Sequence, residues 1–196
     1  MRSLLVLISG FSGTGKTTLA KKIAERYSLP LISKDDIKES LYDSLGYSDR
    51  EWSKQLGVAS YNLLYLFTEN LLATEHSVII ESNFKFGIDT IKLLNLKHKY
   101  QFSLLQIHCY VEIAIALQRF KNRSRSLERH PGHVDHLIYE EMESNFKKGG
   151  YEILNICDRE AYPKGNHTIK IETSDFDSID YQAIYQTIEN YHTAIN

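Results

Sequence analysis

Residues 10–17 read GFSGTGKT and match the pattern G-x-x-x-x-G-K-[ST] at every fixed position. A largely apolar run, Leu4–Ser9, precedes this segment, and a helical pattern, Lys16–Tyr27, follows its last glycine. Glycine allows backbone angles that aim successive N–H groups inward, and the start of a helix adds partial positive charge. The strand, turn and helix therefore predict a phosphate-binding loop (P-loop) built on a buried strand of an α/β fold.

The polar residues of the P-loop have distinct expected tasks. Lys16 should reach the β- and γ-phosphate oxygens, and the Thr17 hydroxyl should bind Mg²⁺. The full set of expected nucleotide contacts in the loop is Gly10, Ser12, Gly13, Thr14, Gly15, Lys16, Thr17 and Thr18. Because the guanine-reading motif N-K-x-D does not occur in the chain, ATP is the expected nucleotide. Glu81 ends a later strand where Walker B motifs carry Asp, and we expect it to hold a water bound to the same Mg²⁺.

Short apolar runs alternate with longer helical patterns along the chain. The predicted strands are 4–9, 30–33, 78–80, 102–111 and 168–172, and the predicted helices are 16–27, a short one from about residue 36, 49–74, 88–97, 113–123, 135–147 and 178–191. This alternation indicates a five-stranded parallel sheet covered by helices on both faces. With 196 residues and no repeat or linker, we expect one α/β domain of the P-loop NTPase class, 1–196.

The longest predicted helix, 49–74, is expected to begin with a capping box formed by Ser48 and Glu51. Its apolar residues recur every three to four positions, which predicts a single buried stripe. The stripe consists of Trp52, Leu56, Ala59, Leu63, Phe67 and Leu71.

The composition, with 42% hydrophobic and 24% charged residues, is typical of a soluble globular protein. A formal net charge of −2 gives no overall attraction to nucleic acid or to anionic membranes. Cys109 and Cys157 form no spaced framework, which suits a reducing compartment, and no apolar run is long enough to span a membrane. The apolar start resembles a signal peptide, but a glycine-rich turn follows it in place of a cleavage site, so we expect a cytoplasmic protein.

The segment SKDDIK, 33–38, ends the second predicted strand. Open α/β sheets bind their ligands at the carboxyl ends of the strands, so Asp35 and Asp36 lie where a phosphoryl acceptor would bind. The alternative is helix capping, because Asp36 and Glu39 have the spacing of a capping box.

Four segments carry a resemblance to a known kinase group: the P-loop, SKDDIK, IIESNF at 79–84, and a basic segment that leads into RHPGHVD at 129–135. In these segments the chain resembles the P-loop kinases that include phage polynucleotide kinase, zeta toxins and chloramphenicol phosphotransferase. It is most similar to uncharacterised AAA family ATPases, or predicted kinases, with RHPGH in the lid. The resemblance implies a nucleoside-monophosphate-kinase-like fold in which Asp35 accepts the proton of the acceptor hydroxyl. Polynucleotide kinases carry Arg where this chain has Lys38, and Lys cannot make the same bidentate contact with an acceptor phosphate.

Five cations lie between residues 119 and 129, where the chain average of 23 in 196 predicts about 1.3. They are Arg119, Lys121, Arg123, Arg125 and Arg129. The resemblance implies a basic lid, about 119–136, in which Arg119 and Arg123 contact ATP while Arg123 and Arg129 neutralise charge in the transition state. A solvated basic face and an RNA-binding patch are the alternatives, although only Phe120 offers a ring for base stacking.

The lid ends in three histidines, His130, His133 and His136, at a spacing of three. We expect His130 and His133 to contact substrate when the lid closes, with a structural turn or a zinc site as alternatives. Zinc is disfavoured because Pro131 and Gly132 force a turn between the first two histidines and no cysteine lies within 20 residues.

Other residues are expected beside the acceptor or the adenine. The candidate acceptor contacts are Lys38, Asn83 and Lys85, with Arg50 and Trp52 as weaker candidates. Backbone near Thr173–Asp175 is expected to surround the adenine, and Asp135 to cap the helix that it begins.

These features predict an ATP- and Mg²⁺-dependent kinase that transfers the γ-phosphoryl group to a hydroxyl of a small molecule. Nucleic acid is a less favoured partner, and no membrane partner is expected. A polynucleotide 5′-hydroxyl kinase is the first alternative, which the basic lid favours and the overall acidity and Lys38 oppose. A nucleotide-binding regulatory or toxin-like module with little turnover is the second.

Overall fold

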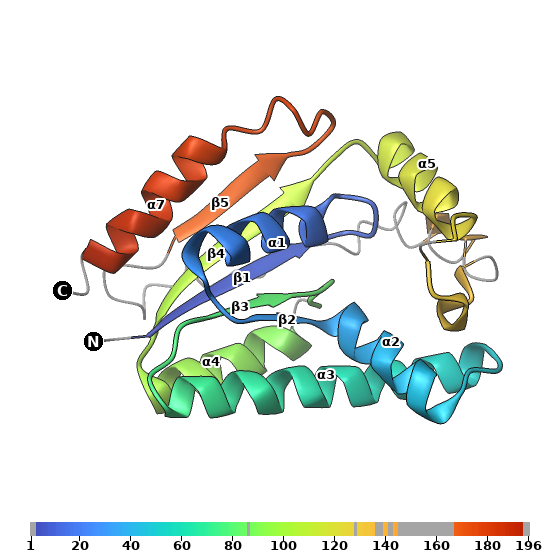
Figure 1. The fold of residues 1–196 in the computed structure, drawn as a ribbon, viewed down its shortest axis with the longest axis horizontal. Coiled ribbons are helices and arrows are strands. Elements are labelled where there is room, and N and C mark those ends of the chain that lie inside the picture. Colours follow the sequence, from blue (N-terminus) through green and yellow to red (C-terminus); the bar gives the residue numbers. More distant parts are fainter. Residues whose placement is uncertain are drawn as a thin grey trace.

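The computed structural model describes residues 3–85, 87–127, 129–135, 139–140, 143–144 and 167–193. Five parallel strands form one sheet in the order β2-β3-β1-β4-β5, which confirms the predicted fold class (Figure 1). The strands are β1 (Leu4–Gly10), β2 (Leu31–Ser33), β3 (Val78–Glu81), β4 (Ser103–Tyr110) and β5 (His167–Glu172). Strand β1 is central and fully buried, as a strand covered on both faces must be.

Helices cover both faces of the sheet (Figure 1). They are α1 (Lys16–Tyr27), α2 (Lys34–Leu45), α3 (Arg50–Ala73), α4 (Ile88–Tyr100), α5 (Ile113–Ser124), the 3₁₀ turn η1 (Pro131–His133) and α7 (Tyr181–Thr193). One apolar core joins the sheet to α1 and α7, and a second joins it to α3 and α4. Helices α2 and α5 both lie beyond the carboxyl ends of the strands, so the residues that they carry meet at that edge.

The buried face of α3 differs from the predicted stripe. It consists of Ser53, Leu56, Ser60, Leu64, Tyr65, Thr68 and Leu72, whereas Phe67 is 45% exposed. The hydroxyls of Ser60 and Thr68 donate to the carbonyls of Leu56 and Leu64, four residues earlier, at 2.6 Å each. Because these hydroxyls form hydrogen bonds within the helix, small polar residues can face the core. A prediction from apolar residues alone therefore placed the buried stripe about one residue before its observed position.

Two predicted helix caps are wrong. Asp49, rather than Ser48, caps α3, because its carboxylate accepts the backbone N–H of Trp52 at 2.8 Å. Ser33 caps α2 by accepting the N–H of Asp36, so Asp36 lies in the first helical turn. In both helices a polar side chain a few residues before or after the predicted cap accepts the backbone N–H instead. The carboxylate of Asp135 binds Arg129, and residues 136–138, which would show whether Asp135 also caps a helix, lie outside the described part of the chain.

The remaining predictions on chain organisation fall partly outside the described residues. Of the predicted helix 135–147, the described pairs 139–140 and 143–144 are helical, and Asp135 is also described. The rest of that range, which includes His136, lies outside the described residues, as do 151–166 with Cys157. Within the described part of the chain, no helix is long and apolar enough to cross a membrane.

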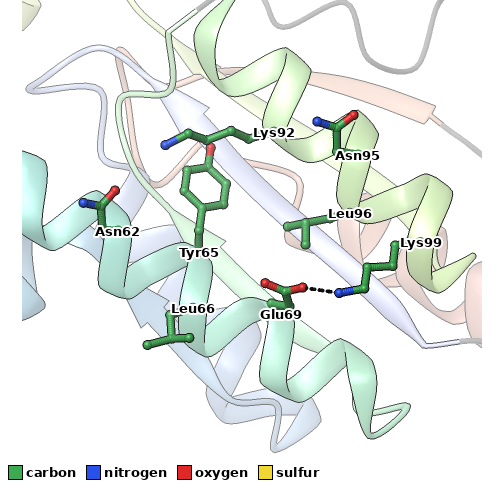
Figure 2. Close-up of a pocket in the computed structure, with 8 residues that line it drawn as sticks. All are labelled: Asn62, Tyr65, Leu66, Glu69, Lys92, Asn95, Leu96 and Lys99. Atoms are coloured by element: carbon green, nitrogen blue, oxygen red, sulfur yellow. Dashed lines mark hydrogen bonds and ion pairs between the residues drawn. The ribbon is translucent and has the colours of Figure 1, made fainter.

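A surface pocket of about 410 Å³ opens between α3 and α4. Tyr65 and Leu96 project into it, and Glu69 accepts a hydrogen bond from Lys99 at 2.8 Å along its edge (Figure 2). None of the residues predicted for the nucleotide or the acceptor lines this pocket. The candidate site therefore lies elsewhere, at the carboxyl edge of the sheet.

Candidate active site

The P-loop follows β1 and is shaped by three glycines with positive φ. The φ angles are 142° at Gly10, 86° at Gly13 and 76° at Gly15, which residues with a side chain adopt only under strain. A Cβ at Gly13 would also lie 2.5 Å from the carbonyl oxygen of Ala116 on α5. The loop is therefore packed directly against α5.

Lys16 begins α1 and folds back across the P-loop. Its Nζ donates to the carbonyl oxygen of Phe11 at 2.8 Å and lies 3.9 Å from Glu81 Oε1. Burial lowers the pKa of Lys16, and the nearby carboxylate of Glu81 opposes that shift. The ammonium group thus lies inside the loop, in position to meet phosphate oxygens.

Glu81 joins the P-loop to the end of β2. Its Oε2 accepts hydrogen bonds from Thr17 Oγ1 at 3.3 Å and from Ser33 Oγ at 3.0 Å. Burial raises the pKa of Glu81, while Lys16 lowers it. The structure thereby brings together Thr17 and Glu81, the two residues predicted to hold Mg²⁺ directly and through water.

Asp35 lies in the first turn of α2, two residues beyond Ser33. Lys34 Nζ lies 3.0 Å from Asp35 Oδ1, and Arg129 Nη1 donates to Asp35 Oδ2 at 3.2 Å. Burial raises the pKa of Asp35, but the charges of Lys34 and Arg129 and the hydrogen bond from Lys34 outweigh burial and hold it well below its usual range. Asp35 is therefore ionised at neutral pH, as a group that orients a hydroxyl must be.

Arg129 is enclosed by carboxylates. Its Nε donates to Asp135 Oδ2 at 2.7 Å, and its Nη1 is shared between Asp35 and Glu39, the latter at 3.4 Å. Arg129 thus lies on the acceptor side of the site, against the expected acceptor-orienting group.

Two histidines of the segment predicted to be a lid, His130 and His133, bind α2. His133 Nε2 lies 2.7 Å from Glu39 Oε1, and His130 Nε2 lies 3.1 Å from Asp43 Oδ1. Within the described residues, no group of three or more His, Cys, Asp or Glu side chains is placed to hold a metal ion. Sequence reasoning missed Glu39 and Asp43 as the partners of these histidines.

Arg119 and Arg123 of α5 have different surroundings. Arg119 donates to the carbonyl oxygens of Thr173 at 2.8 Å and Ser174 at 2.7 Å, and its guanidinium lies 4.3 Å from the ring centroid of Phe176. It thus lies beside the segment that was expected to surround the adenine. By contrast, Arg123 Nε is buried and has no hydrogen-bond partner among the residues that the structure describes, so it is a candidate charged donor for the site. Phe176, which covers Gly15, had no signal in the sequence.

Lys38 is a buried lysine whose hydrogen-bond partner is a hydroxyl. Its Nζ donates to Ser53 Oγ at 2.9 Å, and Ser53 also shares a hydrogen bond of 2.7 Å with the Tyr42 hydroxyl. Burial, helped by the charge of Lys34 and opposed by that of Asp35, lowers the pKa of Lys38 to about 7.

The depressed pKa of Lys38 predicts a pH-dependent stability. Unfolded Lys38 holds its proton to about pH 10.4, whereas the folded side chain loses it near pH 7. Between these values the unfolded state binds more protons, so the stability contributed by this group rises with pH, by at most about 1.4 kcal/mol per unit. We expect Lys38→Met to stabilise the protein at pH 6 and to lose that advantage by pH 9.5. Thermal unfolding of wild type and Lys38→Met across this pH range measures the difference, with the exposed Lys21→Met as the control. A stability difference between wild type and Lys38→Met that does not change with pH would contradict the prediction.

The loop after β3 positions Asn83 and Lys85. Asn83 Nδ2 donates to Ser12 Oγ of the P-loop at 3.1 Å, and the Tyr61 hydroxyl of α3 donates to the carbonyl oxygen of Asn83 at 3.0 Å. The side chain of Lys85 is exposed, and its backbone N–H donates to the carboxylate of Asp89. Asn83 therefore lies beside the P-loop, and Tyr61 is a supporting residue that the sequence pattern did not reveal.

Arg50 and Trp52 lie at the start of α3. Trp52 is half-buried outside the apolar cores, and its Nε1 donates to the carbonyl oxygen of Gly46 at 3.0 Å. The indole thus closes the connection between α2 and α3 instead of joining the core. Arg50 is half-buried and contributes positive charge near Lys38.

Comparisons with known proteins agree with this fold. A family profile described as AAA domain matches residues 5–148. A provisionally assigned kinase from Chloroflexus aurantiacus J-10-fl is 31% identical, with 97% of this chain and 99% of that chain covered and a TM-score of 0.81. No curated protein sequence matches the chain.

More distant solved structures share the fold alone. Kti12 of Chaetomium thermophilum, solved with ADP-AlF3, is 18% identical over 98% of this chain and 99% of that chain, with a TM-score of 0.64. The APS kinase CysC of Mycobacterium tuberculosis, solved with AMPPNP and APS, is 13% identical over 96% and 98%, with a TM-score of 0.52. The chain belongs to the AAA domain family and has the fold of the P-loop kinases.

Proposed function

We propose that this protein is an ATP-dependent kinase that transfers the γ-phosphoryl group to a hydroxyl of a small-molecule acceptor. One observation carries the proposal: Glu81 connects the P-loop residue Thr17 to Ser33, which caps the helix that presents the ionised Asp35. A phosphate-binding loop and an acceptor-orienting carboxylate thus share one edge of the sheet. This is the pairing that phosphoryl transfer to an alcohol requires.

The residues present fit ATP and Mg²⁺. The glycines leave no room for side chains at the loop. The buried Nε of Arg123, which has no partner within the described ranges, offers a charged donor to a phosphate oxygen. Thr17 and Glu81 would hold Mg²⁺, the latter through water, and the ion would neutralise phosphate charge. Arg119 would contact the nucleotide at the adenine end, next to Thr173.

In the transfer step the acceptor oxygen forms a bond to the γ-phosphorus as the bond from that phosphorus to the bridging oxygen breaks, and ADP leaves. Asp35 orients the hydroxyl and takes its proton, while Lys16 and Arg123 stabilise the negative charge on the phosphoryl oxygens. Asn83, Lys85 and Lys38 would contact the acceptor. The transition state of such transfers is loose, so correct positioning matters more than the basicity of Asp35.

The proposal predicts acceptor-dependent turnover. We expect ADP formation to rise when the correct member of a panel of sugars, sugar acids, nucleosides and amino alcohols is added to the protein with ATP and Mg²⁺. A coupled ADP assay measures it, with the protein omitted as the control. Tight ATP binding without stimulation by any hydroxyl compound would favour a nucleotide-binding module with little turnover instead.

A polynucleotide 5′-hydroxyl kinase is the second candidate, and the basic residues of α5 and the lid favour it. Each protein contact with a nucleic-acid phosphate releases counterions, so affinity would fall steeply with salt. Binding of a 5′-hydroxyl oligonucleotide across a salt series decides between the candidates. A steep salt dependence together with 5′ phosphorylation would replace the small-molecule acceptor by nucleic acid.

A further inference from the structure

The RHPGH turn, residues 129–133, lies against one face of α2. Asp35 begins this face, and the residues four, seven and eight positions after it lie on the same side of the helix. We call it the α2 face: Asp35, Glu39, Tyr42 and Asp43. Arg129, His130 and His133 of the turn all make their hydrogen bonds with α2 on this face.

Tyr42 fixes where the turn lies on the α2 face. Its buried ring stacks on His130, with centroids 5.2 Å apart, and meets the edge of His133 at 5.4 Å. A Cβ at Gly132 would lie 2.6 Å from the ring carbon Cγ, so the backbone of the turn lies directly on the ring. The glycine between the two histidines is therefore needed for this close approach.

The turn also determines how its histidines bond. The N–H of Gly132 donates to His130 Nδ1 at 3.0 Å, which leaves Nε2–H to donate to Asp43. Burial lowers the pKa of His133 to about 3, so this ring is neutral and donates to Glu39 without cancelling its charge. The negative charge of Glu39 remains available to Arg129.

Glu39 holds the arginine that reaches Asp35. Its Oε1 accepts from His133 Nε2 and from Arg129 Nη1, and the same Nη1 donates to Asp35 Oδ2. Asp135 holds the other side of the guanidinium at 2.7 Å. The direction from which Arg129 meets Asp35 is thus set by two carboxylates that do not take part in the reaction.

We propose that Glu39 is a positioning residue that acts through Arg129, by fixing the lid turn on the α2 face and thereby the orientation of the Asp35 carboxylate. The inference rests on the proposed function of Asp35. Small errors in the position of a catalytic group cost large factors in rate, so a residue two contacts away can control turnover. No contact of Glu39 with ATP is required.

Hydrogen exchange tests the structural half of the proposal without any need for turnover. The backbone N–H groups of Gly132 and His133, and that of Val134 directly after the turn, donate hydrogen bonds to acceptors within the turn. In the full chain we expect Glu39→Ala to accelerate exchange of these amides about tenfold, Glu39→Gln to do so less, and Asp36→Asn not at all. Asp36 is a matched control because it is an exposed carboxylate in the same helix. Unchanged exchange in Glu39→Ala would overturn the proposal.

Kinetics test the functional half, with the acceptor found in the panel. We expect Glu39→Ala to lower kcat by about 10- to 100-fold with little change in KM for ATP, and Glu39→Gln to recover part of the loss, because its amide oxygen can still accept from His133 and Arg129. Because Glu39 acts through Arg129, the change should cost less than about twofold in an Arg129→Ala background.

The outcomes separate this inference from the proposed function. An unchanged kcat in Glu39→Ala, or a loss that persists undiminished in Arg129→Ala, would show that Glu39 does not position Arg129 for the reaction. A wild-type protein that binds ATP but phosphorylates no acceptor would contradict the proposed function and, with it, any positioning role in transfer. In that case the exchange data still decide whether Glu39 holds the turn.

Discussion

Replacing Lys16 with alanine should lower kcat/KM for ATP by roughly 10³-fold or more, because a preorganised cation at the transferring phosphoryl group is lost. The P-loop itself should stay folded. Lys16 is buried, its pKa is lowered by that burial, and its Nζ bonds to a backbone carbonyl within the loop. Removal of the ammonium group therefore relieves a desolvation cost while it removes a phosphate contact.

Thermal unfolding with and without ATP separates these effects. A ligand that binds only the folded state raises its stability by an amount set by the ratio of free ligand to Kd, so ATP should stabilise the wild type and barely stabilise Lys16→Ala. Lys21→Ala, which removes an exposed lysine from the same helix, is the matched control. Retention of both turnover and ATP stabilisation in Lys16→Ala would mean that ATP does not bind at the P-loop.

Replacing Asp35 with asparagine should lower kcat by about 10²- to 10⁴-fold, the range for loss of a general base, with KM for ATP nearly unchanged. The amide keeps the shape of the side chain but cannot accept a proton from the hydroxyl. It also presents a single oxygen to two cations, Lys34 and Arg129, so one of these loses its acceptor.

Asp35→Asn should also change how the stability of the fold depends on pH. The pKa of Asp35 is depressed in the folded protein, so its ionised form stabilises the fold above the ordinary Asp pKa, and that contribution is lost as the pH falls through the folded value. Wild type should therefore unfold at a higher temperature than Asp35→Asn at pH 7, with a smaller difference at the lowest pH that the fold tolerates. Steady-state kinetics should be measured well below both unfolding temperatures, with Asp36→Asn as the control.

The fold was largely predictable because its signals are local. The apolar run of β1, the P-loop pattern and the alternation of elements follow from backbone preferences and burial on both faces of a parallel sheet. The P-loop residues and the proximity of Thr17 to Glu81 follow in turn, because carboxyl ends of neighbouring parallel strands meet at one edge.

The contact between the RHPGH turn and α2 was not predictable in this way. His133 and Glu39 are separated by 94 residues, and no periodicity links a turn to a helix face so distant along the chain. The same holds for Arg119 and Phe176, whose contact depends on how α5 and the segment after β5 pack. Hydrophobic patterns also miss satisfied hydroxyls such as those of Ser60 and Thr68, which is why the buried face of α3 was misplaced.

The most direct test of the central claim is a single-turnover experiment with γ-³²P-labelled ATP and the acceptor that the panel identifies. Wild type and Asp36→Asn should move the label from ATP to the acceptor hydroxyl at equal rates. Asp35→Asn should leave it on ATP over the same period, although it still gains thermal stability from ATP. Equal transfer by Asp35→Asn and Asp36→Asn would contradict the assignment of Asp35 as the residue that accepts the hydroxyl proton.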